Sequence, residues 1–322
     1  MSEPSRRLRI AAVPLMLGAG ALVAVQSQLN GDLAVELGSG PRAGFGAAVI
    51  SFGSGLLLVS LITALLPSGR RGVGNLRRAL ANHTVRPPEM IGGAFGAFLV
   101  ATQGLTVGTI GVALFSIAVT AGQSSSALLV DHLGIGPSGH KSLSMPRLIA
   151  ATFAVAAVIL AAGERLSAAF GWQTALFAIL ALLAGAGTAI QQAINGRLSA
   201  VGGPWATTLN NFVVGTCVLL VCFALSLLAG GRLTDLPSDP ALYAGGTIGV
   251  GFIWLAAVLV KVHGVLVLGL SMIAGNVMGA ELIELVGGTT HIGPIGVIAG
   301  ALTLSGVLIA VLVRPRSPMP AA

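Results

Sequence analysis

Charged side chains are too scarce in this chain of 322 residues to cover a water-soluble globule. Only 8% of the residues are Asp, Glu, Lys or Arg, whereas 55% are hydrophobic. Soluble domains carry about 25% charged residues. Gly is also frequent, at 46 residues, and small residues allow helices to pack closely where lipid is the solvent. The composition therefore predicts an all-α polytopic membrane protein embedded in a lipid bilayer.

Apolar runs of about 20 residues, long enough to cross a bilayer as a helix, recur along the chain. A short hairpin near Gly108 is expected to separate the third and fourth runs. The first run follows a basic start, but we interpret it as a retained helix because an internal repeat includes it. About ten transmembrane helices are predicted, at 10–36, 43–66, 89–108, 111–132, 147–163, 172–198, 205–229, 241–260, 264–286 and 294–313.

Lys and Arg in the connections predict the orientation, since these residues are enriched in cytoplasmic loops. With the N-terminus in the cytoplasm, 14 of the 17 Lys and Arg residues lie inside, and only Arg42, Arg165 and Arg232 lie outside. Both termini are therefore expected on the cytoplasmic side of the cell inner membrane. The net charge of +7 reflects this orientation, and no nucleic-acid partner is indicated.

Two segments of the chain recur. Residues 26–33 resemble residues 191–198 in their Gln, Asn, Gly and Leu positions, and residues 111–135 align without gaps to 264–288. Each half of the chain, 1–163 and 164–322, thus holds about five helices. Because five is odd, the second half must enter the membrane from the opposite side, as in many secondary transporters. We predict two inverted five-helix repeats.

The run from Ala121 to Gly134, with the letters AGQSSSALLVDHLG, resembles the hallmark of the YdcZ-type family of the drug/metabolite transporter superfamily. Members of that family resemble five-helix units, and this chain is similar to two such units fused. The second half departs from the hallmark at Asn276, Glu284 and Leu285. The resemblance implies a transporter fold and leaves the substrate open.

Neutral amides within the predicted helices are candidate substrate or coupling residues, because polar groups are costly in a bilayer. Gln26 and Asn30 are four residues apart, and Gln191 and Asn195 repeat that spacing. Such amides can hydrogen-bond neighbouring helices or line a polar pocket, and the spacing does not choose between these roles.

A second pair of amides, Gln123 and Asn276, lies at matching positions of the longer repeat, each directly after a Gly. A Gly beside an amide can mark a local break in a helix that faces a cavity, or it can mark close packing. Both readings are open from the sequence.

Two carboxylates, Glu281 and Glu284, lie three residues apart on one predicted helix and share nearly one face. Glu284 and its repeat counterpart Asp131 are expected to end their helices at an interface. Glu281 lies one turn deeper, so it is a candidate for proton coupling, with a purely structural role as the alternative.

Asp32 and Arg197 occupy equivalent positions of the shorter repeat with opposite charge. Inverted topology places them near opposite faces of the membrane, so we predict no contact between them. Arg197 is interpreted as an orientation anchor.

We expect a secondary transporter of an unidentified small molecule, with alternating access between the two repeats. The alternatives are a non-transporting membrane subunit or anchor, and an enzyme acting on lipid-linked substrates. No catalytic cluster, cofactor motif or metal-ligand spacing is found, and the two cysteines, Cys217 and Cys222, are not spaced for a disulfide or a metal. A monomer or homodimer is expected.

Overall fold

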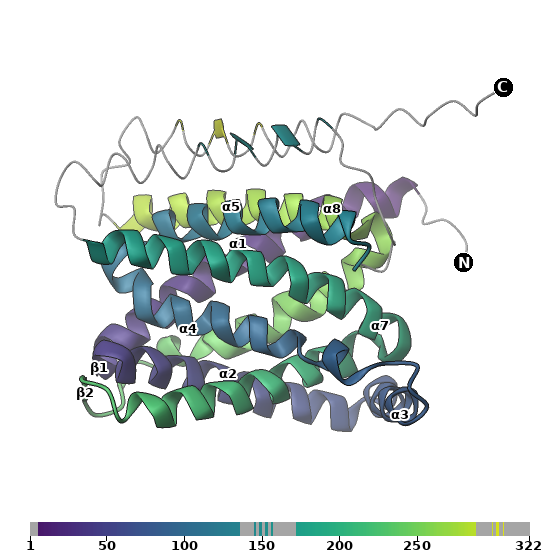
Figure 1. Ribbon diagram of the computed structural model, residues 1–322, viewed down its shortest axis with the longest axis horizontal. Helices are drawn as coiled ribbons and strands as arrows, with labels where there is room; N and C mark the ends of the chain where they lie inside the picture. The colour runs from purple at the N-terminus through teal and green to yellow at the C-terminus, as the bar shows by residue number, and fades with distance from the viewer. Residues whose placement is uncertain are drawn as a thin grey trace.

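The computed structural model describes residues 6–135 and 172–287, with isolated residues between 145 and 156 and between 298 and 305. The described part is a stacked bundle of helices (Figure 1). Its α-helices are α1 (Arg6–Leu37), α2 (Gly40–Leu65), α3 (Pro67–Ala81), α4 (Gly92–Ile110), α5 (Val112–His132), α7 (Trp172–Ser226) and α8 (Gly245–Gly287). Two 3-10 helices, η1 (Pro87–Met90) and η2 (Pro240–Ala244), and two short strands, β1 (Gly38–Ser39) and β2 (Arg232–Leu233), complete it.

Five described helical stretches are long and apolar enough to cross a membrane. One of them, α7, has 55 residues and would extend about 80 Å if straight. It turns instead at Gly203, whose φ of 76° is easily reached only by glycine, so α7 covers the two predicted spans 172–198 and 205–229. The predicted spans 241–260 and 264–286 fall on η2 and α8 together. The predicted spans 147–163 and 294–313 lie largely outside the described residues, so a total of ten spans remains a prediction.

The predicted hairpin near Gly108 is found three residues later. The α4 helix ends at Ile110, Gly111 has a φ of 78°, and α5 begins at Val112. The connection predicted at 67–88 holds a helix of its own, α3, with arginines on its exposed side and Leu76 and Ala79 buried.

Two pairs of segments that the sequence analysis placed on a common side of the membrane lie in contact. The α1–α2 connection pairs with the α7–α8 connection, because β1 and β2 form an antiparallel ladder, and both were expected outside. Arg197 lies near the end of the part of α7 that precedes Gly203, and it donates to the carbonyl of Gly134 at 3.0 Å. Both of those residues were expected inside.

Glycines allow α1 and α7 to contact helices of the opposite half through backbone atoms. A Cβ atom at Gly20 of α1 would collide with the carbonyl of Met272 in α8, and one at Gly185 of α7 would collide with the carbonyl of Val119 in α5. Gly20 corresponds to Gly185 in the register of the shorter repeat, and Met272 corresponds to Val119 in the longer repeat. The same contact is therefore made twice, with the two halves exchanged. A second matched pair runs in the reverse sense: Gly275 against the carbonyl of Leu17, and Gly122 against that of Leu182.

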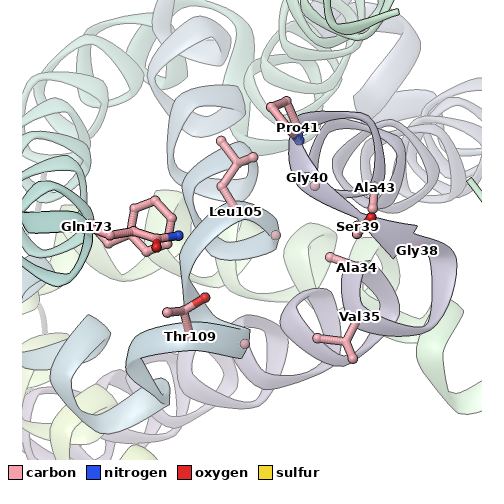
Figure 2. Close-up of a pocket in the computed structure, with 14 residues that line it drawn as sticks. Ala34, Val35, Gly38, Ser39, Gly40, Pro41, Ala43, Leu105, Thr109 and Gln173 are labelled. Atoms are coloured by element: carbon pink, nitrogen blue, oxygen red, sulfur yellow. The ribbon is translucent and has the colours of Figure 1, made fainter. Parts of the chain in front are cut away.

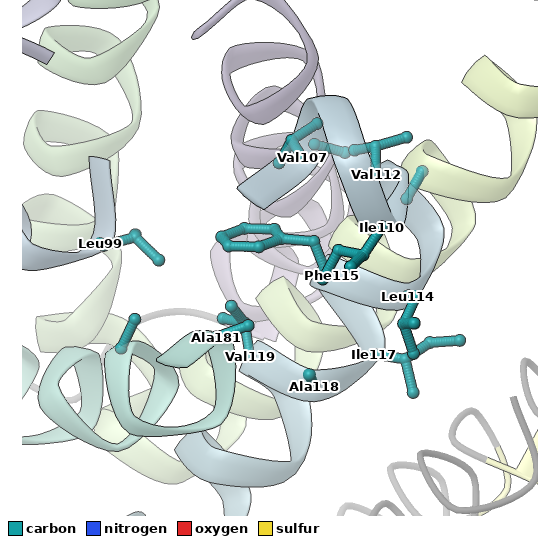
Figure 3. Packing of buried hydrophobic residues seen from close by; sticks show 13 residues of the cluster. Leu99, Val107, Ile110, Val112, Leu114, Phe115, Ile117, Ala118, Val119 and Ala181 are labelled. Carbon is teal, nitrogen blue, oxygen red and sulfur yellow. The ribbon is translucent and has the colours of Figure 1, made fainter. Parts of the chain in front are cut away.

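The same exchange appears between α2 and the part of α7 that follows Gly203. Phe212 packs onto Gly55 and Phe52 packs onto Gly215, while the two rings lie 5.0 Å apart. A larger apolar cluster joins α4, α5 and α7, and Figure 3 shows Leu99, Phe115 and Ala181 meeting there. Helices of each half therefore pack directly against helices of the other half, so the two halves do not form separate bundles.

The outer face of the bundle is apolar. Leu57, Leu61 and Leu65 on one face of α2 are 76%, 57% and 67% exposed. A stripe of exposed leucines of this kind is suited to lipid and not to water.

We predict that Gly20→Ala and Gly185→Ala each lower the thermal unfolding temperature of the purified chain in detergent. The added methyl meets a backbone carbonyl, and overpacking of this kind costs about 1–3 kcal/mol. Gly18→Ala, in the same helix with nothing within 4 Å of the new Cβ, serves as the control and should be neutral or stabilising. Equal effects at Gly18 and Gly20 would contradict the close contact.

Candidate functional site

The seven residues predicted to bind substrate or couple transport fall into three groups in the structure. All are buried or half-buried. Two groups form hydrogen-bonded clusters, one around each amide pair, while the third consists of residues on α5 and α8. The members are Gln26 and Asn30, then Gln191 and Asn195, and finally Gln123, Asn276 and Glu281.

A chain of hydrogen bonds orients the amide of Asn30. Ser27 donates its hydroxyl proton to the carbonyl of Val23 at 2.8 Å, so it must accept from Gln103, whose Nε2 lies 2.9 Å away. The Oε1 atom of Gln103 then accepts from Asn30 Nδ2 at 2.7 Å. This order leaves the Oδ1 atom of Asn30 facing away from Gln103.

Gln26 reaches the start of α8 from the same face of α1. Its Nε2 donates to the carbonyl of Gly245 at 3.0 Å. A Cβ atom at Gly249 would lie only 2.7 Å from that Nε2, so glycine is needed for the approach. We define the first-half cluster as Gln26, Ser27, Asn30, Gln103 and the adjacent Ser51.

The second-half cluster, Gln191, Asn195 and Asn211, is centred on one amide. Asn211 Nδ2 donates to the carbonyl of Thr207 and to Asn195 Oδ1, both at 2.8 Å. Its Oδ1 accepts from Gln191 Nε2 at 3.0 Å. Gly96 lets α4 approach, because a Cβ there would lie 2.7 Å from Gln191 Nε2. Both clusters thus hydrogen-bond across helices, which is one of the two roles that the sequence left open.

The sequence analysis missed Gln103, Ser51 and Asn211. A repeat signal for the latter two is present, since Ser51-Phe52 with a glycine at 55 parallels Asn211-Phe212 with a glycine at 215. Gln103 has no counterpart of its type, because Ala256 occupies the matching position of α8, so repeat matching cannot find it.

A small cavity of about 40 Å³ lies beside the second-half cluster, which is room for a few water molecules. Its polar wall is formed by α7 and includes Gln191, Gln192 and Asn195, and its apolar wall is formed by α8 and includes Ala256. In the first half, the matching position holds Gln103, which donates to Ser27 and accepts from Asn30. The two clusters therefore differ in bonding.

Two larger cavities open at the end of the bundle where α1 ends. One of about 430 Å³ lies between the α1–α2 connection, α4 and the start of α7, with Val35, Thr109 and Gln173 on its lining (Figure 2). Its neighbour, about 580 Å³, shares Val35 and Thr109. The neighbour is lined by several acidic side chains, Asp32, Glu36, Asp239 and Glu284.

No helix break accompanies Gln123 or Asn276. Gly122 and Gly275 lie within α5 and α8 and contact backbone carbonyls of other helices. Close packing is therefore the correct reading of these glycines. Asn276 accepts a long hydrogen bond of 3.4 Å from Ser116.

Glu284 has a more specific role than the predicted end of a helix. Its side chain is buried, and its Oε1 accepts from the backbone N–H of Ala113 at 2.8 Å, in the first turn of α5. A carboxylate there satisfies a free N–H and the helix dipole. The counterpart Asp131 has no described side chain. Glu281 is half-buried, and its Oε1 is buried with no hydrogen bond within the described ranges.

Asp32 and Arg197 do not contact one another, as predicted. Gln28 donates to Asp32 at 2.7 Å, whereas Arg197 pairs with Glu89 at 3.2 Å. Arg197 therefore has a specific ion-pair partner that the sequence did not indicate. Among the described residues no group of three or more His, Cys, Asp or Glu side chains could hold a metal ion.

Comparisons with known proteins agree with this architecture. A family model described as "Putative inner membrane exporter, YdcZ" matches residues 11–160 and 176–309. A solved structure titled "Crystal structure of protein" is similar over 96% of this chain and 98% of its own, with 15% identity and a TM-score of 0.60. That likeness concerns the fold alone. No curated protein matches the chain.

We predict that Asn211→Ala lowers the unfolding free energy by about 1–3 kcal/mol for each buried partner left without a hydrogen bond. Gln191 Nε2 and Asn195 Oδ1 both lose their partner. The control, Asn75→Ala on the exposed side of α3, should change stability by less than about 0.5 kcal/mol. Thermal unfolding in detergent measures both, and equal effects would refute the central role of Asn211.

Proposed function

Because the chain belongs to the YdcZ family of inner membrane exporters, we propose that it is a secondary transporter that carries a small molecule out of the cell by alternating access between two inverted repeats. The family supports a membrane transporter rather than an enzyme. The observation that carries the mechanism is the exchange of equivalent contacts between halves, such as Gly20 with Met272 and Gly185 with Val119. Two copies of one unit related by a pseudo-two-fold axis make each contact twice with the halves exchanged, which is the arrangement expected of inverted repeats.

The substrate site in this proposal is the cavity beside the second-half cluster. Gln191, Gln192 and Asn195 offer donors and acceptors from α7, and α8 offers an apolar wall that includes Phe252 and Met272. No charged side chain lines the cavity within the described residues. A small molecule with neutral hydrogen-bonding groups and an apolar part fits such a lining.

The two clusters would correspond to the two ends of the transport path. Under the orientation with both termini in the cytoplasm, the cavity lies toward the inside, where an exporter loads its substrate. Its counterpart toward the outside is filled by Gln103, which is hydrogen-bonded to Ser27 and Asn30. The structure would then be the state closed to the outside, and its cavity would enlarge on opening inward.

One chain contains both halves and their shared interface, so a monomer would suffice for transport. Glu281 is the candidate for proton coupling, because its half-buried carboxyl has an oxygen with no hydrogen bond among the described residues.

We predict that Ala256→Gln abolishes ligand binding at the cavity while the chain still folds. The new amide side chain on α8 would fill the cavity, at the position that Gln103 occupies on α4. A thermal-shift screen of a metabolite library in detergent should give ligands for the natural chain, and these should be lost in Ala256→Gln. Flux of the ligands from proteoliposomes should fall in parallel.

The control for this experiment is Ala200→Gln, the same change on an exposed part of α7, which should keep both binding and flux. Ligands that still bind and cross the membrane in Ala256→Gln would place the substrate elsewhere.

For coupling, we predict that Glu281→Gln removes the dependence of flux on a pH gradient in proteoliposomes, because an amide cannot carry a proton at neutral pH. The variant should still bind the ligands in detergent. Flux that keeps its pH dependence in this variant would exclude Glu281 as the coupling group.

A further inference from the structure

Three buried oxygen atoms of the first-half cluster have no hydrogen-bond donor among the described residues. They are Gln26 Oε1, Asn30 Oδ1 and Ser51 Oγ, on side chains that are 2%, 0% and 1% exposed. Buried polar atoms in native proteins are almost always paired with protein, water or an ion. Three such atoms in one cluster therefore require an explanation.

These side chains converge on the first residue of α8. A Cβ atom at Gly245 would lie 2.5 Å from Asn30 Oδ1 and 3.0 Å from Ser51 Oγ, so both oxygens approach the same space. Gln26 reaches the same glycine, whose carbonyl accepts from its Nε2. Asn30 on α1 and Ser51 on α2 thus direct oxygen atoms toward the first residue of α8, and Gln26 on α1 lies against the same residue.

The second-half cluster explains what is different here. Gly92 occupies the position matching Gly245, and a Cβ there would lie 2.9 Å from Asn195 Oδ1 and 3.2 Å from Asn211 Oδ1. There, the amide of Asn211 donates to Asn195 and accepts from Gln191. Ser51 stands at the position of Asn211, and its shorter side chain cannot bridge the corresponding partners.

The chemistry of the three atoms limits what can take the place of that amide. The side-chain NH₂ groups of both amides already donate hydrogen bonds, Gln26 to Gly245 and Asn30 to Gln103. What remains is two amide oxygens, which can only accept, and one hydroxyl, which can accept or donate, so the ligand must supply donors to the amides or be a cation. Neutral oxygens without a carboxylate do not balance a divalent ion, which is normally held by Asp or Glu. None of the three groups titrates near neutral pH, so they do not form a proton site.

We infer that the first-half cluster is a Na⁺ site, in which Gln26 Oε1, Asn30 Oδ1 and Ser51 Oγ serve as ligands beside Gly245. Transporters hold coupling ions with this kind of neutral oxygen near repeat interfaces. The ion would tie α1 and α2 of the first half to α8 of the second, so its binding would stabilise the contact between these three helices.

An acidic cavity lies at the same end of α1 as the cluster. Asp32, one turn or less from Asn30 on α1, and Leu242, one turn before Gly245, both line the acidic cavity of about 580 Å³. Asp239 and Glu36 line it as well, and no Lys or Arg is among its described lining residues. Acidic walls of this kind raise the local concentration of cations.

The role of the ion in transport rests on the proposed function, but its binding does not, so we test binding in detergent. The full-length chain is unfolded thermally in NaCl, KCl and choline chloride at equal ionic strength, and ²²Na⁺ binding is measured in parallel. NaCl should raise the unfolding temperature with a saturable dependence on concentration, because a ligand of the native state stabilises it by mass action. KCl and choline chloride should not.

Ser51→Asn is the decisive variant, because it gives the first half the amide that the second half has. It should lose both the response to Na⁺ and ²²Na⁺ binding while unfolding in choline chloride at no lower temperature than the natural chain. Ser51→Ala, which removes one ligand, should raise the half-saturating Na⁺ concentration by about tenfold or more. Ser60→Asn, the same change at an exposed position of α2, should respond to Na⁺ like the natural chain.

Two results would overturn the Na⁺ site. The natural chain would respond equally to NaCl and choline chloride if water, rather than an ion, pairs the three oxygens. Alternatively, Ser51→Asn would fold and keep the full Na⁺ response if the ion binds elsewhere. Loss of ligand flux alone, with Na⁺ binding intact, would count against the proposed transport function and not against the site.

Discussion

The architecture depends on backbone contact between helices of opposite halves, made possible by glycine. In lipid no hydrophobic effect draws helices together, so close packing and hydrogen bonds must hold them. Gly20 and Gly185 meet this need at equivalent places, each against a carbonyl of the other half. Because α1 packs on α8 and α7 packs on α5, neither half can bury its polar groups alone. The interface between halves is therefore the centre of the fold.

On that shared frame, two substitutions make the halves chemically different. Gln103 in one half corresponds to Ala256 in the other, and Ser51 corresponds to Asn211. The first difference places an amide next to Asn30 in one half, whereas in the other half Ala256 lines a cavity beside Asn195. The second leaves three buried oxygens of one cluster without a hydrogen bond to any described residue, whereas in the other cluster Asn211 bonds both Gln191 and Asn195. The two clusters therefore differ in their polar chemistry, although the glycine contacts around them are repeated.

The hydrogen-bond order in the clusters follows from the fixed chemistry of a few atoms. A backbone carbonyl can only accept, so Val23 fixes the hydroxyl of Ser27, which in turn fixes Gln103 and Asn30. In the second half, the carbonyl of Thr207 fixes the amide of Asn211 in the same way. Each cluster thus has one definite arrangement of donors and acceptors, and the oxygens that remain are a consequence of it.

Composition and spacing along single helices were enough to predict the membrane class, the apolar runs and the pairing of amides such as Gln26 with Gln191. They also predicted correctly that Asp32 and Arg197 do not meet. The hydrogen bond of Glu284 to the first turn of α5, and the place of Gln103 beside Asn30, became visible only in the folded bundle. Those contacts join residues far apart in the chain, and no local periodicity records which helices a folded bundle brings together.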